Sequence, residues 1–282
     1  MQNISLSNGV MIPQEGYGVF QIDNEETARC VSDALSCGYR LIDTAAAYGN
    51  EQGVGEAIKN SGIAREELFI TTKLWVQDAS YEGAKKAIGT SLSNLGLSYI
   101  DLYLIHQPFG DYYGAWRAME EAYEAGTLKA IGVCNFDEAR LADLCENAKV
   151  KPMVNQVEIH PFFQQQAAMD VMKEYGVAPQ AWGPLSEGQK DIFHNELLKS
   201  IGDKYEKTVA QVILRWHVQR EVIIIPKSSK KNRMEENMNI WDFELSDEDM
   251  EQIATMDIGH SEIINHHIAG TAKMLNQWKI HE

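Results

Sequence analysis

The chain lacks several features that would place it in a specialised class of protein. Its four cysteines, at positions 30, 37, 134 and 145, form no CxxC pair and have no histidine partner at zinc-ligand spacing. The simplest prediction is therefore a reduced, cytoplasmic setting without structural disulfides. The opening residues MQNISLSNGVMIP lack the charged head and apolar block of a signal peptide. No apolar run approaches the roughly 20 residues that a membrane helix requires, so no membrane partner is expected.

Positive charge is also scarce. Lysine and arginine total 25 against 41 aspartates and glutamates, which gives a formal net charge of −16. Such a field repels phosphates, so nonspecific binding to nucleic acid or to anionic membranes is disfavoured. The length of 282 residues is near the roughly 250 of a single eight-fold α/β barrel, although two smaller domains would also fit. Hydrophobic residues make up 44% of the chain, enough for a large core.

Against this acidic background, a short basic segment stands out. The sequence KSSKKNRMEEN follows directly behind the apolar run Val222–Pro226, which is typical of a parallel strand buried on both faces. Lys227 offers a point charge, Ser228 a hydroxyl donor and Arg233 a planar fork, a combination that can clamp a phosphate group. A basic segment after a strand can also be a solvated helix start, and the segment alone does not decide between the two.

Short apolar runs alternate with helix-period stretches along the whole chain. The ranges 84–95, 116–123 and 209–216 each place apolar residues on one helical face. Such alternation indicates a parallel sheet, and eight repeats favour closure into a barrel over an open doubly wound sheet, the runner-up. The predicted strands are Gly16–Phe20, Leu41–Thr44, Leu68–Lys73, Ile100–His106, Ala130–Val133, Val154–Ile159, Ala178–Trp182 and Val222–Ile225.

We therefore predict one domain over residues 1–282, a (β/α)8 TIM barrel of the α/β class. The GVM turn within Asn8–Met11 predicts a small N-terminal β-hairpin ahead of the barrel, placed where it could plug the bottom. Extra helices are expected at the C-terminus, where Ser246 and Asp249 have the spacing of a helix-opening capping box.

In such a barrel, polar residues at the C-terminal ends of strands are the catalytic candidates. Asp43 ends the second predicted strand, Lys73 the third and His106 the fourth, and Tyr48 lies five residues beyond Asp43 in a loop. A charged residue behind an apolar run is costly to bury unless it is paired, so Asp43 and Lys73 are expected to pair at the barrel rim. That pair alone could be purely structural. A tyrosine and a histidine at corresponding positions favour a catalytic cluster.

Taken together, these segments resemble an aldo-keto reductase over essentially the whole chain. The ordered motifs that carry the resemblance are NGVMIPQEGYGVF, LIDTAAAYGNEQGVGEAI, LFITTKLW, YIDLYLIHQP, AIGVCNF, NQVEIHPF, AWGPL and IPKSSKKNRMEEN. AWGPL and RMEEN make the chain most similar to the bacterial branch that includes diketogluconate and glyoxal reductases. The resemblance implies a monomeric, NADPH-dependent oxidoreductase that reduces small aldehydes or ketones to alcohols without a metal ion.

The catalytic tetrad of that family matches Asp43, Tyr48, Lys73 and His106. The resemblance implies that the nicotinamide supplies a hydride to the carbonyl carbon while Tyr48 donates a proton to the oxygen. A tyrosine ordinarily titrates near pH ~10, and Lys73 is expected to lower that pKa by stabilising the phenolate. Asp43 would keep Lys73 charged and aimed, and His106 would hydrogen-bond the substrate oxygen.

The resemblance also implies a coenzyme site along the barrel rim. Phe20 and Trp75 sit at strand ends and could be plain rim packing, but because they flank the catalytic strands we expect them as apolar walls of the substrate pocket beside His106. Cys134 stands where the family usually has serine, and a thiol is a weaker donor to the nicotinamide carboxamide. The phosphate clamp indicates NADPH rather than NADH. The expected coenzyme contacts are Asp43, Asn135 and Gln156 near the nicotinamide, Trp182 stacked on its ring, Lys227, Ser228 and Arg233 on the 2′-phosphate, and Glu236 and Asn237 near the adenine.

A second hypothesis of another class is a binding protein on the same scaffold, in which coenzyme occupancy regulates a partner and turnover is negligible. Fold alone does not separate the two, but a pure sensor has no need of all four tetrad residues. A phosphate-binding barrel with other chemistry does not explain Tyr48 and Lys73 together.

Overall fold

The computed structural model describes residues 2–282 of the chain. Within that range, eight parallel strands form one sheet in the order β10-β9-β8-β7-β6-β5-β4-β3. The strands are β3 (Gly16–Gly18), β4 (Leu41–Asp43), β5 (Phe69–Leu74), β6 (Ile100–Ile105), β7 (Leu128–Cys134), β8 (Val154–Glu158), β9 (Ala178–Trp182) and β10 (Ile223–Ile224).

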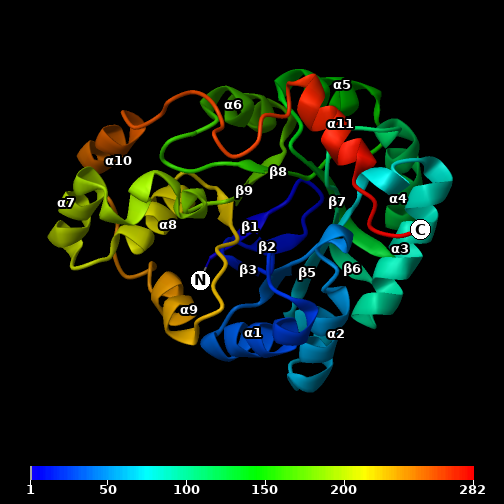
Figure 1. The fold of residues 1–282 in the computed structure, drawn as a ribbon, viewed down its shortest axis with the longest axis horizontal. Helices are drawn as coiled ribbons and strands as arrows, with labels where there is room; N and C mark the ends of the chain where they lie inside the picture. The colour runs from blue at the N-terminus through cyan, green and yellow to red at the C-terminus, as the bar shows by residue number, and fades with distance from the viewer. Residues whose placement is uncertain (1) are drawn as a thin grey trace.

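The two end strands of this sheet meet, so the sheet closes into a barrel. The backbone N–H of Ile224 donates to the carbonyl of Gln14 at 2.9 Å, and that of Gly18 donates to Pro226 at 3.2 Å. Figure 1 shows the strands at the centre of the molecule with helices around them. The predicted (β/α)8 barrel is therefore confirmed, and the open doubly wound sheet is not found.

Helices follow nearly every strand and cover the outside of the barrel. Ser80 caps α3 by accepting from the backbone N–H of Gly83, and Gly96 ends that helix with a φ of 65°, a conformation that suits glycine. The helices are α1 (Asn24–Cys37), α2 (Glu51–Asn60), α3 (Tyr81–Leu95), α4 (Tyr112–Glu124), α5 (Glu138–Asn147), α6 (Gln166–Tyr175), α7 (Glu196–Tyr205), α8 (Val209–Gln219), α9 (Lys231–Met238), α10 (Asp247–Ala254) and α11 (Ala269–Gln277). No helix within residues 2–282 is both long enough and apolar enough to span a membrane.

Both additions to the barrel that the sequence predicts are present. Strands β1 (Asn3–Ser5) and β2 (Met11–Pro13) pair antiparallel as the N-terminal hairpin. Asn8 at its turn donates to the carbonyl of Lys129, near the start of β7, so the hairpin covers the N-terminal end of the barrel (Figure 1). At the other end of the chain, the capping box of Ser246 and Asp249 opens α10.

The predicted strands differ from the observed ones mainly at their C-terminal ends. The first, second, fourth and sixth predicted strands extend one or two residues beyond β3, β4, β6 and β8. The residues just past these strands still contact the sheet, since the backbone N–H groups of Val19, Thr44 and His106 donate to the carbonyls of Asp43, Thr71 and Leu74. The shortest strand is β10, which has two residues and pairs with β9 through Ile223 and Ile224.

A buried carboxyl lies at the seam where β3 and β10 close the barrel. Glu15 is fully buried; one of its carboxyl oxygens accepts from the indole of Trp241 at 2.8 Å, and the other has no hydrogen-bond partner among the described residues. Burial raises the pKa of Glu15 from 4.5 to about 8, although the Trp241 hydrogen bond opposes the shift. The carboxyl is therefore held in its neutral form in the folded protein at pH 7.

This buried carboxyl predicts a pH-dependent stability that one substitution removes. Because the pKa of Glu15 is raised on folding, its contribution to the free energy of unfolding is complete below pH 4.5. That contribution is lost as the pH rises to about 8 and the carboxyl ionises. Glu15→Gln keeps an acceptor for Trp241 but carries no charge, so it should abolish this loss. At pH 8 it should raise the free energy of unfolding by a few kcal/mol, because each unit of pKa shift corresponds to about 1.4 kcal/mol.

Urea unfolding from pH 4.5 to 9, compared between wild type and Glu15→Gln, measures the effect. Glu244→Gln, at an exposed position of the chain, is the matched control and should run parallel to wild type. Identical pH profiles for wild type and Glu15→Gln would show that Glu15 is already ionised in the folded protein.

Candidate active site

The structure brings the four predicted catalytic residues together at the C-terminal end of the barrel. Asp43 ends β4, Lys73 lies in β5 and His106 directly follows β6, while Tyr48 ends the short 3-10 turn Ala46–Tyr48. The ammonium of Lys73 donates to the Asp43 carboxylate at 2.5 Å and to the Tyr48 hydroxyl at 3.4 Å. The rings of Tyr48 and His106 meet edge to face, with centroids 5.6 Å apart. Lys73 therefore lies between a carboxylate and the hydroxyl of the proposed acid.

The loop that carries Tyr48 is fixed by buried hydrogen bonds. Thr44 donates its hydroxyl to the side-chain oxygen of Asn50 at 2.7 Å, and the amide of Asn50 donates to the carbonyls of Val19 and Ile22, each at 3.0 Å. These bonds tie both ends of the loop to the end of β3. The tyrosine hydroxyl is thus held in place by the backbone, before any ligand binds.

Two opposing effects act on the ionisation of Lys73 and Tyr48. Burial acts to lower the pKa of Lys73, but Asp43 and Tyr48 raise it above its ordinary value, so the ammonium stays charged. Burial raises the pKa of Tyr48 to about 12, and the attraction of Lys73 only partly offsets this. The predicted effect of Lys73, which lowers the pKa of Tyr48 by stabilising the phenolate, is confirmed. Desolvation of the phenolate, which that prediction does not include, is the larger effect and sets the net direction.

His106 is held as a neutral imidazole. Burial and the neighbouring charge of Lys73 lower its pKa well below 6.5. Its backbone carbonyl accepts from the amide of Asn135 at 3.1 Å, and its ring packs edge-on against Trp75 with centroids 5.2 Å apart. A neutral imidazole can donate one hydrogen bond to a carbonyl oxygen without competing with Tyr48 to lose a proton.

The residues expected at the nicotinamide form a connected polar group beside the tetrad. The Trp182 indole donates to the Asn135 side chain at 2.8 Å. Gln156 uses its amide N–H groups on Asp43, at 2.9 Å, and on Gln180, at 3.0 Å, which leaves its carbonyl oxygen as an acceptor for a carboxamide. The Gln180 contact was not predicted, because a buried glutamine within a strand has no signal of its own in the sequence.

Cys134 ends β7 near this polar group but lines neither cavity of the site. Its side chain is buried, and burial raises the pKa of the thiol, with Lys73 opposing the shift. The thiol is therefore neutral and offers only a weak donor. How it contacts a carboxamide stays a prediction.

The residues of the predicted phosphate clamp lie on the loop after β10 and on α9. Lys227 and Arg233 are exposed, and neither forms an ion pair with any described residue. Ser228 is mostly buried, and its hydroxyl accepts from the backbone N–H of Lys230 at 3.1 Å. The predicted clamp thus consists of two cations without ion-pair partners among the described residues, Lys227 beside a turn that Ser228 shapes and Arg233 in α9.

The two residues expected near the adenine differ in their surroundings. Glu236 already accepts from the hydroxyl of Thr208 at 2.7 Å, and Asn237 is buried. Both lie on α9, in the turn after Arg233. Their part in binding an adenine stays a prediction.

One cavity of about 570 Å³ joins the tetrad to the phosphate end of the site. Phe20 and Trp75 line it as predicted, together with Lys227. The C-terminal segment adds walls that sequence reasoning missed, chiefly Met274 and Trp278. Trp75 donates its indole N–H to the Trp278 carbonyl at 2.8 Å. No local motif marks these C-terminal residues, because they reach the cavity only when the folded chain brings the C-terminal segment back beside the end of β5.

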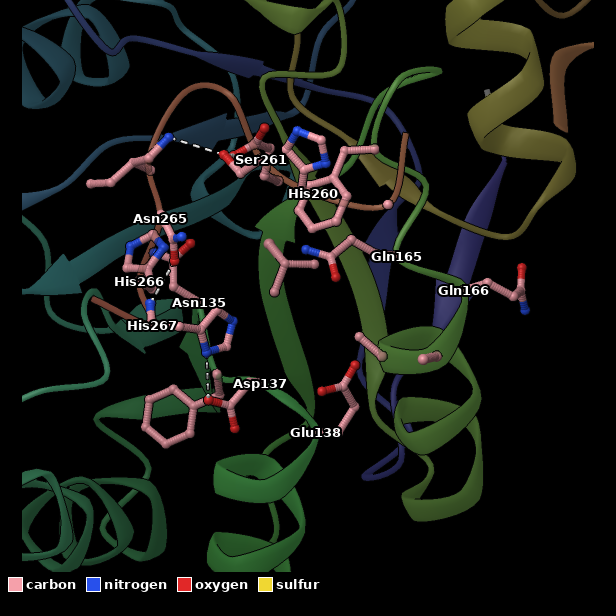
Figure 2. A pocket seen from close by; sticks show the side chains of 18 of the residues that line it. Asn135, Asp137, Glu138, Gln165, Gln166, His260, Ser261, Asn265, His266 and His267 are labelled. Atoms are coloured by element: carbon pink, nitrogen blue, oxygen red, sulfur yellow. Dashed lines mark hydrogen bonds and ion pairs between the residues drawn. The ribbon is translucent and has the colours of Figure 1, made fainter. Parts of the chain in front are cut away.

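A second cavity of about 390 Å³ borders the first and shares Asn135, Trp182 and His266 with it. Figure 2 shows its polar lining, with Asp137 facing His267 and with Ser261 and Asn265 contributed by the C-terminal segment. His266 bonds through its ring to the side chain of Gln107 at 3.0 Å. Tyr48, Lys73 and His106 do not line this cavity, so the candidate chemistry belongs to the larger one.

Comparisons with known proteins agree with this geometry. The model of the Aldo/keto reductase family matches residues 5–258. The glyoxal reductase of Bacillus subtilis is 51% identical over 252 residues, covering 89% of this chain and 91% of the relative. The methylglyoxal reductase DkgA of Escherichia coli is 43% identical over 259 residues, covering 91% and 94%.

A solved structure extends the likeness to three dimensions. The aldo-keto reductase of Bombyx mori, determined in complex with NADP, superposes with a TM-score of 0.88 at 34% identity and covers 93% of this chain and 95% of that one. A family model that spans most of the chain, together with relatives of this identity and coverage, confirms the predicted resemblance: the chain belongs to the aldo/keto reductase family.

Proposed function

We propose that the protein is an NADPH-dependent reductase that converts small aldehydes or ketones, α-dicarbonyls among them, to alcohols. The observation that carries the proposal is the buried contact of Lys73 with both Asp43 and Tyr48, beside a neutral His106. Related enzymes named for glyoxal and methylglyoxal reduction support the substrate class. The family's work on carbonyl compounds supports the direction of the reaction.

The described residues fit NADPH, although of the proposed clamp only Lys227 lines the cavity itself, and Arg233 lies outside its lining. Lys227 and Arg233 are cations without ion-pair partners on a protein whose net charge is −16, which suits a phosphate dianion better than a ribose hydroxyl. At the other end, the free carbonyl of Gln156 and the Trp182 ring match a carboxamide and an aromatic ring. The complex of the Bombyx mori relative with NADP is consistent with this fit.

When bound, the coenzyme supplies the hydride that attacks the carbonyl carbon. The chain supplies the proton, which Tyr48 donates to the carbonyl oxygen as the alkoxide develops. Burial raises the pKa of Tyr48 to about 12, which keeps the phenol protonated across the neutral range. The hydroxyl therefore carries its proton before each turnover. Lys73 then stabilises the phenolate that remains, 3.4 Å from its nitrogen.

The other residues of the site orient the substrate. His106 is proposed to donate a hydrogen bond to the same carbonyl oxygen and to stabilise its growing negative charge. In this mechanism the histidine and the tyrosine together polarise the carbonyl, and no metal takes part. Phe20 and Trp75 exclude water from the reacting atoms as apolar walls.

We further infer that the enzyme acts as a monomer in the cytoplasm. All the residues assigned to the tetrad and to coenzyme binding come from one chain, so no second copy is needed to complete the site. The four cysteines are free thiols, which fits a reducing compartment.

The first prediction concerns the proton donor. Tyr48→Phe removes the hydroxyl and keeps the ring, so NADPH-dependent turnover of methylglyoxal should fall by about 10²- to 10⁴-fold, while the Kd for NADPH stays within about twofold of wild type. Absorbance of NADPH gives the rate, and tryptophan fluorescence quenching gives the affinity. Tyr113→Phe, which removes an exposed hydroxyl bonded to Asp143, is the matched control.

Near-wild-type turnover by Tyr48→Phe would falsify the assignment of Tyr48 as acid. If the wild type binds NADPH tightly but turns over no glyoxal, methylglyoxal, aldehyde or keto-sugar, the regulatory binding protein becomes the better hypothesis.

The second prediction concerns the coenzyme. Removing both clamp charges with Lys227→Ala and Arg233→Ala should weaken NADPH binding by at least about a hundredfold, because each charge-assisted contact contributes roughly 1.5–3 kcal/mol. Binding of NADH, which has no 2′-phosphate, should be unchanged. Titration of both coenzymes, with Lys199→Ala on exposed α7 as the charge control, measures the difference. An equal loss for NADPH and NADH would contradict the clamp assignment.

A further inference from the structure

The strand that closes the barrel also contacts the backbone of the phosphate clamp. The N–H of Gly18 in β3 donates to the carbonyl of Pro226 at 3.2 Å. The hydroxyl of Tyr17, the residue before it, donates to the carbonyl of Ser228 at 2.5 Å. Lys227 therefore lies between two carbonyls that β3 holds, one through its backbone and one through a side chain.

A second tyrosine holds the part of the clamp that carries Arg233. Tyr39, just before β4, donates its hydroxyl to the carbonyl of Met234 in α9 at 3.2 Å. Met234 is the neighbour of Arg233 in the sequence. Tyr17 and Tyr39 are both almost completely buried, and their ring centroids are 5.7 Å apart. The two hydroxyls thus extend from one packed aromatic pair to the two parts of the clamp.

Apart from the buried side chain of Met234, which packs in the core, the clamp end of α9 has few contacts that hold its backbone. No side chain caps the N-terminus of this eight-residue helix, and its first turn contains no acidic residue. Its far end, in contrast, is bonded to α8, since the Gln211 amide donates to the carbonyls of Glu236 and Asn239 at 3.1 and 2.9 Å. The side-chain hydrogen bonds to the backbone of α9 are therefore divided between Gln211 of α8 at one end and Tyr39 at the other, while Tyr17 holds the loop that precedes the helix.

Charge makes this anchoring necessary. The segment KSSKKNR places four cations within seven residues, and like charges so close repel one another. A loose segment would relax by spreading these side chains, and binding a phosphate would then require it to be ordered again. Fixing the backbone on both sides of Lys227 and beside Arg233 removes that ordering cost in advance.

We propose that Tyr17 and Tyr39 are positioning residues that pre-form the 2′-phosphate clamp, and so set the preference for NADPH over NADH from strands distant in sequence. The inference rests on the proposed function of Lys227 and Arg233 as that clamp. It assigns to two buried tyrosines a part in coenzyme choice, although neither hydroxyl lines the cavity.

The test removes each hydroxyl and compares the two coenzymes. Tyr17→Phe and Tyr39→Phe should each raise the Kd for NADPH by about three- to tenfold, the loss of one buried hydrogen bond, and leave the Kd for NADH unchanged. Tyr113→Phe is the matched control and should alter neither. Loss of thermal stability does not distinguish the hypotheses, because a purely structural tyrosine also stabilises the fold. The ratio of the Kd for NADPH to the Kd for NADH distinguishes them, because a general loosening of the barrel would weaken the binding of both coenzymes equally.

A double-mutant cycle tests whether the tyrosines act through the clamp. In the Lys227→Ala, Arg233→Ala background, Tyr17→Phe should have no further effect on NADPH binding. Equal weakening of both coenzymes, no change in either, or full additivity in the cycle would each overturn the inference. If Tyr17→Phe does not fold, the ratio of the NADPH and NADH Kd values for Tyr39→Phe tests the inference instead.

The same data separate this inference from the proposed function. Clamp variants that retain wild-type NADPH affinity would show that the phosphate lies elsewhere, and the inference fails with the clamp. Clamp variants that lose NADPH while both tyrosine variants keep it would overturn the inference alone.

Discussion

The buried ammonium of Lys73 is the constraint on which the rest of the site depends. An isolated charge inside a barrel is strongly disfavoured, and Lys73 is fully buried. It is accepted there because Asp43 and the carbonyl of Thr44 receive its hydrogen bonds at 2.5 and 2.8 Å. Asp43 then needs a partner for its second oxygen, which Gln156 supplies, and Gln156 in turn bonds to Gln180. One charge thus organises four strands, β4, β5, β8 and β9, at the end of the barrel where the cavity opens.

The same interaction fits the proposed role of Tyr48 as a proton donor. A tyrosine with a strongly lowered pKa would lose its proton near neutrality and be useless as a donor. Burial prevents this by raising the pKa of Tyr48 to about 12, while Lys73 limits the cost of the phenolate that forms during turnover. The neutral state of His106 has the same origin, because Lys73 adds to the effect of burial on its pKa. Acid and hydrogen-bond donor therefore remain distinct, although their rings touch.

The sequence predicts the parts of this arrangement that have a local signal. Asp43, Lys73 and His106 could be found because a polar residue directly after an apolar run is conspicuous, and the parallel alternation places such residues on one rim. Contacts between residues remote in the chain could not be found this way. Trp75 meets Trp278 across 203 positions, and Tyr17 meets Ser228 across 211, each through one hydrogen bond. The net pKa of Tyr48 could not be predicted either, because the sequence indicates the neighbouring charge of Lys73 but not how deeply the hydroxyl is buried.

The closure of the barrel predicts a link between coenzyme binding and stability. β3 has three residues and β10 has two, so their own ladder supplies few of the bonds that shut the sheet. The seam relies on side chains instead: the indole of Trp241 on Glu15 and the hydroxyl of Tyr17 on Ser228. These side chains hold the same segment that carries Lys227 and Arg233. A phosphate that binds both cations would draw together the loop after β10 and α9, and would thereby strengthen the weakest seam of the barrel.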